Sequence, residues 1–312
     1  MPDSNKKIFI VCLLVVGFFV SIWFLARPRQ EVPPGGQAEQ FSVVTSFYPL
    51  YFFTKEIVGD VATVYNMTPA GAEPHDYEPT ARDIARLESA DLVVVNGGIE
   101  PWLEKVAEEL GKKQITVLRA SDTLGTEEFV DEDGKRVLDP HVWLSPRLAR
   151  IMVGERILSA FIMIDPTHRS IYEKNAADLD EKLKNLDTTF RSGLSSCASK
   201  TIITSHTAFG YLAKEYGLTQ VGITGLSPDA EPTPKQLAEI AALAKENNVR
   251  TIFFESLTSP ELAETLAREI GATTAVLNPL EGLSAEEIAA GKDYFTEMRY
   301  NLSQLRNALQ CP

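Results

Sequence analysis

The chain has 312 residues, a hydrophobic fraction of 44% and a charged fraction of 23%, which are ordinary values for a soluble globular protein. This length is sufficient for one large domain or two medium domains with proper apolar cores. The formal net charge of −13 argues against nucleic acid as a partner, because its phosphates would be repelled.

A long apolar run lies near the N-terminus. Residues 8–26 read IFIVCLLVVGFFVSIWFLA and carry no charge, and a helix of this length would span the hydrocarbon layer of a membrane. Lys6 and Lys7 precede the run, as expected for a cytoplasmic flank. A signal peptide is the alternative, but its apolar region is usually shorter, about 7–15 residues. We therefore predict that residues 1–26 form an uncleaved membrane anchor.

The next segment has the composition of a linker. Residues 27–40, RPRQEVPPGGQAEQ, are rich in Pro, Gly and Gln and cannot bury a core, so they are expected to form a flexible tether. The folded part is predicted to start near Phe41. Its first lobe, residues 41–164, alternates β-branched runs with helical patterns. The predicted strands are 42–47, 63–67, 91–97 and 115–120, and the predicted helices are 80–90 and 101–110.

Two helical runs occupy the middle of the chain. Residues 146–163 form the first, and Asp165-Pro166-Thr167 opens a second that lasts to about Ser195. The second run has no internal Gly or Pro before Gly193, and its length of roughly 40 Å would match a whole lobe. We expect residues 165–195 to be a stiff spanning helix between two lobes.

The second lobe, residues 196–312, repeats the alternation of the first. Its predicted strands are 201–206, 220–224, 251–256 and 273–278, and its predicted helices are 208–216, 233–247, 260–270 and 293–309. Strands that alternate with helices indicate an α/β fold with largely parallel sheets. The prediction is two parallel-sheet lobes joined by one long rigid helix.

The three cysteines are Cys12, Cys197 and Cys311. Cys12 belongs to the apolar run, whereas Cys197 and Cys311 lie near the start and the end of the second lobe. A disulfide between these two would form in the oxidising compartment that the N-terminus indicates, and two free thiols are the alternative.

The sequence has four histidines, His75, His141, His168 and His206, and all but His168 are candidates for metal binding. His75, His141 and His206 are predicted at strand or helix edges, where α/β proteins place ligands, whereas His168 begins the spanning helix. Neutral imidazole is a favoured ligand of zinc, and a carboxylate can complete a tetrahedral set. Because the three positions are far apart in the sequence, only tertiary folding could bring them into one site.

Four motifs carry a resemblance to the zinc and manganese solute-binding proteins of ABC importers. They are GAEPHDYEPTARDIARLESADLVVVNGGIEPW, DPHVWLSP, TSHTAFGYLAKEYGL and LNPLEGL, in this order. The resemblance covers residues 41–307. It implies two α/β lobes joined by a rigid helix, with one metal ion buried in the cleft between the lobes.

Carried over position by position, the resemblance implies that His75, His141 and His206 are metal ligands. A third histidine at position 206 indicates Zn(II), because Mn(II) prefers oxygen ligands. Many family members have Asp where this chain has Asn278, and Glu281 is the expected fourth ligand, with Asn278 or water as alternatives. Glu73 and Glu255 are candidates to hold ligand histidines from behind, and an ordinary surface or capping role is the alternative.

The expected function is that of an extracytoplasmic receptor, periplasmic or at the cell surface. It would capture one Zn(II) per chain, with Mn(II) as an alternative cargo, and deliver it as a monomer to an ABC permease in the same membrane. One alternative is an enzyme in which zinc held by three histidines activates water for hydrolysis or hydration. Another alternative is a surface adhesin with the same fold. Because the sequence has no HExxH, GxSxG or phosphate-loop motif, we expect no enzymatic activity.

Overall fold

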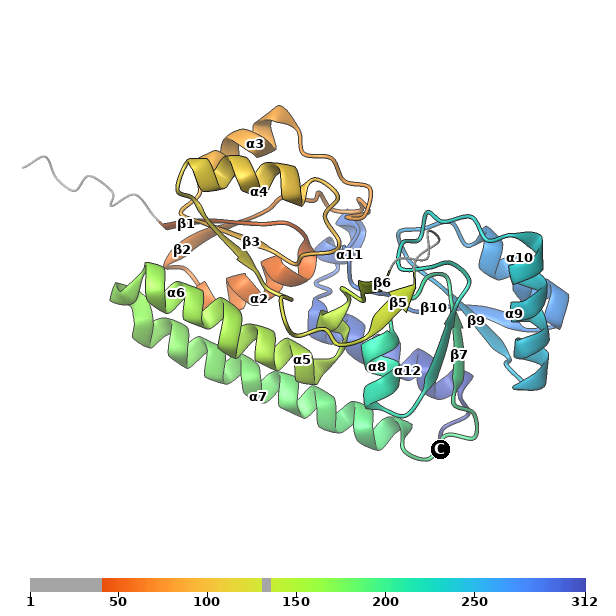
Figure 1. Cartoon of the computed structure of the whole chain (residues 1–312). Helices are drawn as coiled ribbons and strands as arrows, with labels where there is room; N and C mark the ends of the chain where they lie inside the picture. The colour runs from red at the N-terminus through yellow and green to blue at the C-terminus, as the bar shows by residue number, and fades with distance from the viewer. Residues whose placement is uncertain (1–40, 131–135) are drawn as a thin grey trace, which may run out of the picture. The chain divides into compact units, whose positions relative to one another are not determined.

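Two parallel four-stranded sheets provide the frame of the computed structural model, which describes residues 41–130 and 136–312 (Figure 1). The predicted anchor and tether, residues 1–40, lie outside the described residues. Within the two described ranges, no helix is both long and apolar enough to cross a membrane.

The first sheet has the strand order β2-β1-β3-β4, and every neighbouring pair is parallel. Its strands are β1 (Phe41–Thr45), β2 (Ala62–Asn66), β3 (Leu92–Val95) and β4 (Thr116–Arg119). Its helices are α2 (Tyr48–Val58), α3 (Ala81–Glu88) and α4 (Leu103–Lys112). The central strand β3 is a continuous run of buried Leu and Val, as expected for a strand covered on both faces.

The second sheet has the strand order β10-β9-β7-β8 and is also parallel throughout. Its strands are β7 (Thr201–Thr204), β8 (Thr219–Gly222), β9 (Thr251–Phe254) and β10 (Thr273–Val276). Its helices are α8 (Gly210–Glu215), α9 (Pro234–Glu246), α10 (Glu261–Ile270), α11 (Ala285–Ala289) and α12 (Tyr294–Ala308). Capping boxes open α9, α11 and α12; at α9, for example, the box is formed by Thr233 and Gln236.

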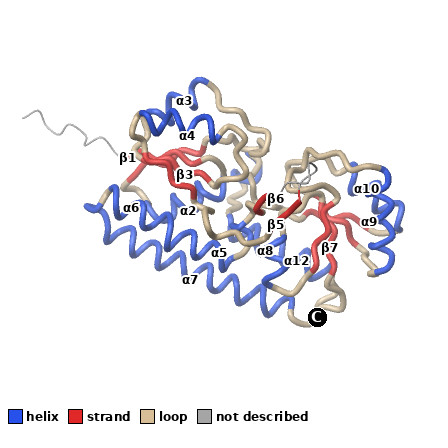
Figure 2. Tube along the Cα trace, in the orientation of Figure 1, coloured by secondary structure: helices blue, strands red, loops and turns tan. Residues whose placement is uncertain are grey.

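The connection between the two sheets begins with a series of short helical segments that follow one another closely. It consists of η1 (Val142–Leu144), α5 (Pro146–Ile151), the π-helical segment η2 (Met152–Ile157), α6 (Leu158–Ile164) and η3 (Pro166–His168). The 26-residue helix α7 (Arg169–Leu194) follows and contacts α6 near its start, α2 and α5 further along and α12 toward its end (Figure 2). The predicted α/β fold of two parallel sheets and one long helix is confirmed.

One apolar core is shared by both lobes. It includes Phe47 after β1, Leu183 in the middle of α7, Phe209 before α8 and Tyr294 in α12, all fully buried. Two smaller clusters fill the opposite face of each sheet, under α3 and α4 in the first lobe and under α9 and α10 in the second. The lobe boundaries 41–164, 165–195 and 196–312 stay predictions, because Phe41–Pro312 forms one compact unit.

Two helices and one hairpin of two strands were not predicted from the sequence. Helix α2 reads YPLYFFTKEIV, and Tyr51 and Phe52 lie beside Lys55 and Glu56 on its less buried face, so the two-sided pattern by which a surface helix is recognised is weak. The hairpin of β5 (Glu128–Val130) and β6 (Arg136–Leu138) is short and mostly polar, and α11 has only five residues. The stability of such short elements comes from contacts with neighbouring parts of the fold, so their own sequence pattern does not reveal them.

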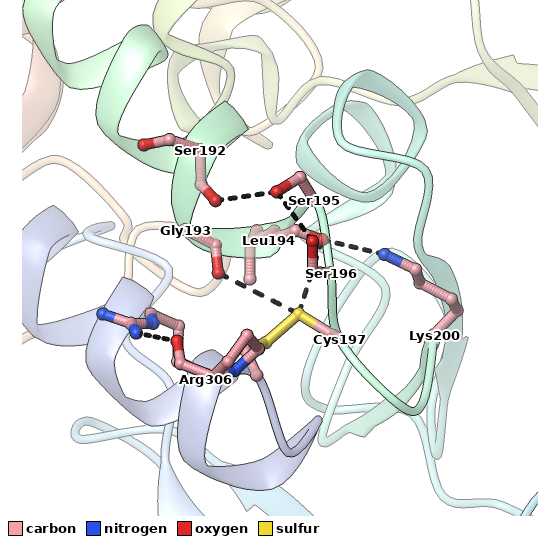
Figure 3. The surroundings of a disulfide bond; sticks show 10 residues. Ser192, Gly193, Leu194, Ser195, Ser196, Cys197, Lys200 and Arg306 are labelled. Carbon is pink, nitrogen blue, oxygen red and sulfur yellow. Dashed lines mark hydrogen bonds between the residues drawn. A yellow bond between two sulfur atoms is a disulfide. The ribbon is translucent and has the colours of Figure 1, made fainter.

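A disulfide joins the two ends of the second lobe (Figure 3). Cys197, just after α7, is bonded to Cys311, just after α12, across 114 residues of sequence. The sulfur of Cys197 lies 3.4 Å from the carbonyl oxygen of Leu194 in the last turn of α7, and Lys200 donates a hydrogen bond of 2.8 Å to the same carbonyl. The bond therefore ties the C-terminus to the end of the spanning helix.

Removing this bond is expected to destabilise the protein. In the double variant Cys197→Ser/Cys311→Ser, the free energy of unfolding should fall by about 2–5 kcal/mol, because a long loop of the unfolded chain is no longer closed. Denaturant unfolding of the full chain measures the change. Reduction of the wild type should reproduce it, and a reducing agent should have no effect on the double variant; equal stability of all forms would contradict the prediction.

Candidate metal centre

Four side chains from distant parts of the sequence meet between the two lobes: His75, His141, His206 and Glu281. His75 lies in the loop between β2 and α3, and His141 directly precedes η1. His206 follows β7, and Glu281 follows β10. Because parallel strands end at the same edge of a sheet, the loops after β7 and β10 deliver their side chains to one place.

The carboxylate of Glu281 is at the centre of this cluster. Its Oε1 atom lies 3.1 Å from Nε2 of His141, 3.3 Å from Nε2 of His75 and 3.4 Å from Nε2 of His206. The Nε2 atoms of His141 and His206 are 3.4 Å apart. A tetrahedron of ligands at about 2.0–2.1 Å from zinc has edges of about 3.3–3.4 Å. Four of the six edges therefore have the lengths that a tetrahedral zinc ion requires, and all four ligand atoms lie within 4.8 Å of one another.

Burial distinguishes His75 from the other three residues. The side chains of His141 and His206 are fully buried and that of Glu281 is 1% exposed, whereas that of His75 is 8% exposed. The second oxygen of Glu281, Oε2, is buried and has no hydrogen-bond partner in the part of the chain that the structure describes. A buried carboxylate oxygen without a donor is costly, and a cation bound beside it would offset this cost.

Two further carboxylates hold the buried histidines from behind. Nδ1 of His141 lies 2.7 Å from Asp139 Oδ1, and Nδ1 of His206 lies 2.6 Å from Glu255 Oε1. A carboxylate that accepts from Nδ1–H leaves the Nε2 lone pair free for a metal and fixes the orientation of the ring. Asp139 was missed from the sequence, although its position two residues before His141 was a possible signal.

The buried histidines have raised pKa values. Burial alone would lower the pKa of His141, but the hydrogen bonds and charges of Asp139 and Glu281 outweigh it and raise the pKa. The pKa of His206 is well above its ordinary value, because the carboxylates of Glu255 and Glu281 outweigh the effect of burial.

The pKa values of two carboxylates at the centre, Glu281 and Glu73, are shifted in opposite directions. Burial would raise the pKa of Glu281, but the three histidines, His206 foremost, hold it well below its usual range. Burial, and then the charge of Glu281, raises the pKa of Glu73 to about 9. Glu73 accepts a hydrogen bond of 3.3 Å from the backbone N–H of His75, so it contacts the ligand loop and not an imidazole ring.

Asn278, the alternative fourth ligand, is engaged elsewhere. Its side-chain Oδ1 accepts a hydrogen bond of 2.7 Å from the backbone N–H of Leu280, and its Nδ2 is 3.5 Å from Glu297 Oε2. The amide therefore shapes the turn that presents Glu281. His168 pairs with Asp165 at 2.7 Å at the start of α7 and does not belong to the cluster.

The sequence matches one protein family over nearly all of the described residues. The family described as "Zinc-uptake complex component A periplasmic" matches residues 43–308. The high-affinity zinc uptake system protein ZnuA of Bacillus subtilis (strain 168) is 44% identical over 284 residues, which cover 88% of this chain and 89% of that protein.

Solved structures share the fold. The Zn(II)-bound ZnuA-like domain of Streptococcus pneumoniae AdcA has a TM-score of 0.75 and 42% identity, and the match covers 86% of this chain and 99% of that domain. The chain spans 60% of the length of the whole AdcA protein. The laminin-binding protein Lmb of Streptococcus agalactiae, described as bifunctional with adhesin and metal transporting activity, has a TM-score of 0.76 and 37% identity, covering 86% of this chain and 99% of that one.

The pairing of His206 with Glu255 leads to a prediction for the metal-free protein. In Glu255→Gln, the pKa of His206 should fall, because the nearest negative charge is lost while burial remains. An NMR titration of the imidazole resonances measures it. Glu78→Gln, which neutralises an exposed carboxylate on the loop of His75, is the control and should leave the pKa of His206 unchanged. A shift of the same size in both variants would contradict the assignment.

Proposed function

The chain belongs to the family of periplasmic zinc-uptake complex component A proteins, and on this premise we propose that it captures one Zn(II) ion between its lobes and delivers it to an ABC-type importer. The proposed ligands are His75, His141, His206 and Glu281. The observation that carries the proposal is the position of Glu281 Oε1, which faces the Nε2 atoms of all three histidines.

The composition of the site supports zinc as the cargo. Three imidazole nitrogens and one carboxylate within 4.8 Å of one another match the ligand set that zinc prefers, whereas manganese prefers more oxygen ligands and a six-coordinate geometry. The negative charge of Glu281 also compensates part of the charge of the ion in a site that water barely reaches.

The same geometry favours a receptor over an enzyme. A catalytic zinc keeps one position for the water that it activates, whereas a closed set of four protein ligands leaves none. Here Glu281 takes the fourth position. The Streptococcus agalactiae relative is described as both an adhesin and a metal transporter, and it is the metal transport that the buried cluster supports in this chain.

The path of the ion follows from the burial of the ligands. His75 is the ligand with the most exposed side chain, and it lies on a long loop, so we propose that zinc enters and leaves on its side. The shared core and α7 oppose a wide hinge motion of the lobes. Release would then require a small displacement of the His75 loop or a small tilt, which the permease would induce when it docks.

The location agrees with this role. The family is periplasmic, and the apolar segment 8–26 is our proposed tether to the cytoplasmic membrane, with the folded part on the outer side. We propose that the receptor acts as a monomer on a permease in the same membrane.

Loss of a ligand should weaken zinc binding strongly. In His206→Ala or Glu281→Ala, zinc affinity should fall at least about 100-fold. The loss of a residue that only hydrogen-bonds to a ligand already costs about 10–100-fold in metal affinity. Competitive titration of the full chain with a zinc chelator measures it, beside a manganese titration in which the wild type binds weakly.

His168→Ala is the matched control for the ligand variants, because it removes a histidine that lies outside the cluster. Its zinc affinity should equal that of the wild type. Unchanged affinity in Glu281→Ala would instead assign the fourth position to water and favour the enzyme, and an absence of zinc binding in the wild type would refute the proposed function.

Zinc affinity should decrease as the pH is lowered. The pKa values of His141 and His206 are raised, so protons compete with zinc for their nitrogens, and the decline should begin above the ordinary histidine pKa of about 6.5. Calorimetry in two buffers of different ionisation enthalpy should detect proton release near neutral pH. In Asp139→Asn the decline should move to lower pH, because the pKa of His141 is then lower; a pH-independent affinity would contradict this mechanism.

A further inference from the structure

The turn that carries Glu281 is anchored from a helix that contributes no ligand. Asn301 of α12 is fully buried, and its side-chain amide makes two hydrogen bonds to the backbone of Asn278. Its Oδ1 accepts from the N–H of Asn278 at 2.9 Å, and its Nδ2 donates to the carbonyl of the same residue at 2.6 Å. One side chain thus satisfies both polar groups of a residue that lies three positions before Glu281.

The turn itself has an unfavourable backbone. Leu280, immediately before Glu281, has a φ of +57°, in the left-handed region that residues other than glycine seldom adopt. The side chain of Leu280 is fully buried, and its N–H donates to Asn278 Oδ1 at 2.7 Å. A residue in this conformation persists only where its surroundings hold it, so the turn depends on contacts beyond its own sequence.

A second contact connects the turn to the segment of His141. Trp143 Nε1 donates to the carbonyl of Pro279 at 2.8 Å, and the hydroxyl of Tyr294 in α12 donates to the carbonyl of Trp143 at 2.7 Å. Trp143 lies two residues after His141. Helix α12 therefore contacts the segments of two proposed ligands, one through Tyr294 and the other through Asn301.

From these contacts we infer that Asn301 is a positioning residue for the metal site. Its amide holds the turn Asn278–Glu281 in the conformation that directs the carboxylate of Glu281 toward the three histidines. The inference rests on the proposed function, because it takes Glu281 as a ligand.

The chemistry of the amide explains why this position suits asparagine. A planar side chain with a donor and an acceptor can bond to the N–H and the C=O of one residue at the same time. Leucine has a similar volume but leaves both groups of Asn278 buried without partners, and serine is too short to reach both. In either variant the turn loses its anchor, and Glu281 should leave its tetrahedral position.

The test compares variants of the full chain by zinc affinity and by the absorption spectrum of bound Co(II), which reports the geometry of the ligands. Asn301→Leu and Asn301→Ser should each bind zinc about 10–100-fold more weakly, as expected for the loss of an outer partner, and should change the Co(II) spectrum. Asn301→Ser supplies the test should Asn301→Leu fail to fold.

Leu305→Ala is the control for a general weakening of α12. Leu305 is fully buried one turn further along the same helix and packs in the shared core. This variant should unfold at lower temperature and yet keep wild-type zinc affinity and the wild-type Co(II) spectrum. An equal loss of affinity in Leu305→Ala and Asn301→Leu would overturn the inference, because α12 would then act only through stability.

A double-variant comparison separates this inference from the proposed function. If Asn301 acts through Glu281, Asn301→Leu should cost almost no further affinity in the Glu281→Ala background. An undiminished cost in that background would overturn the positioning role. Wild-type affinity of Glu281→Ala overturns the ligand assignment and this inference with it, whereas a weakened Glu281→Ala beside a wild-type Asn301→Leu overturns this inference alone.

Discussion

A carboxylate buried among three imidazoles is the constraint on which the rest of the structure depends. Glu281 is 1% exposed, and an ionised group at that depth is costly unless positive charge and hydrogen-bond donors surround it. In the metal-free protein, protons on His141 and His206 provide that charge, which is why their pKa values are raised and that of Glu281 is lowered. Zinc can replace these protons with one compact ion. The need of the buried Glu281 carboxylate for positive charge therefore also favours capture of the metal.

Such a site requires lobes that keep their relative position. The cluster draws His75 and His141 from segments before α7 and His206 and Glu281 from segments after it, and tetrahedral spacing tolerates only small errors. The continuous core under both sheets and along α7 meets this need, because close-packed interiors resist sliding. In the release mechanism that we propose, the same rigidity confines the protein to small movements near the exposed side of the site.

The four proposed ligands are not held equally firmly, and this difference favours entry of the ion from one side of the site. Asp139 and Glu255 hold the rings of His141 and His206, and Asn301 holds the turn of Glu281, all from buried positions. His75 differs: its Nε2 faces Glu281 at 3.3 Å and its backbone N–H donates to Glu73, but among the described residues no carboxylate is paired with its Nδ1. With three proposed ligands firmly held and one on an open loop, we propose that the site admits an ion from one side while the positions of the other three ligands stay unchanged.

The sequence by itself determined the alternation of strands and helices, the long helix, and the motifs around His75, His141, His206 and Glu281, because these follow from local periodicity and resemblance. It could not identify α2, because Tyr51 and Phe52 lie on the same less buried face as Lys55 and Glu56 and obscure the two-sided pattern. Only the tertiary structure decided that Glu281, and not Asn278, faces the histidines, and that Asp139 and Asn301 stand behind the ligands. The physical reason is that these roles depend on distances across the fold, between residues such as Asn278 and Asn301 that no local pattern connects.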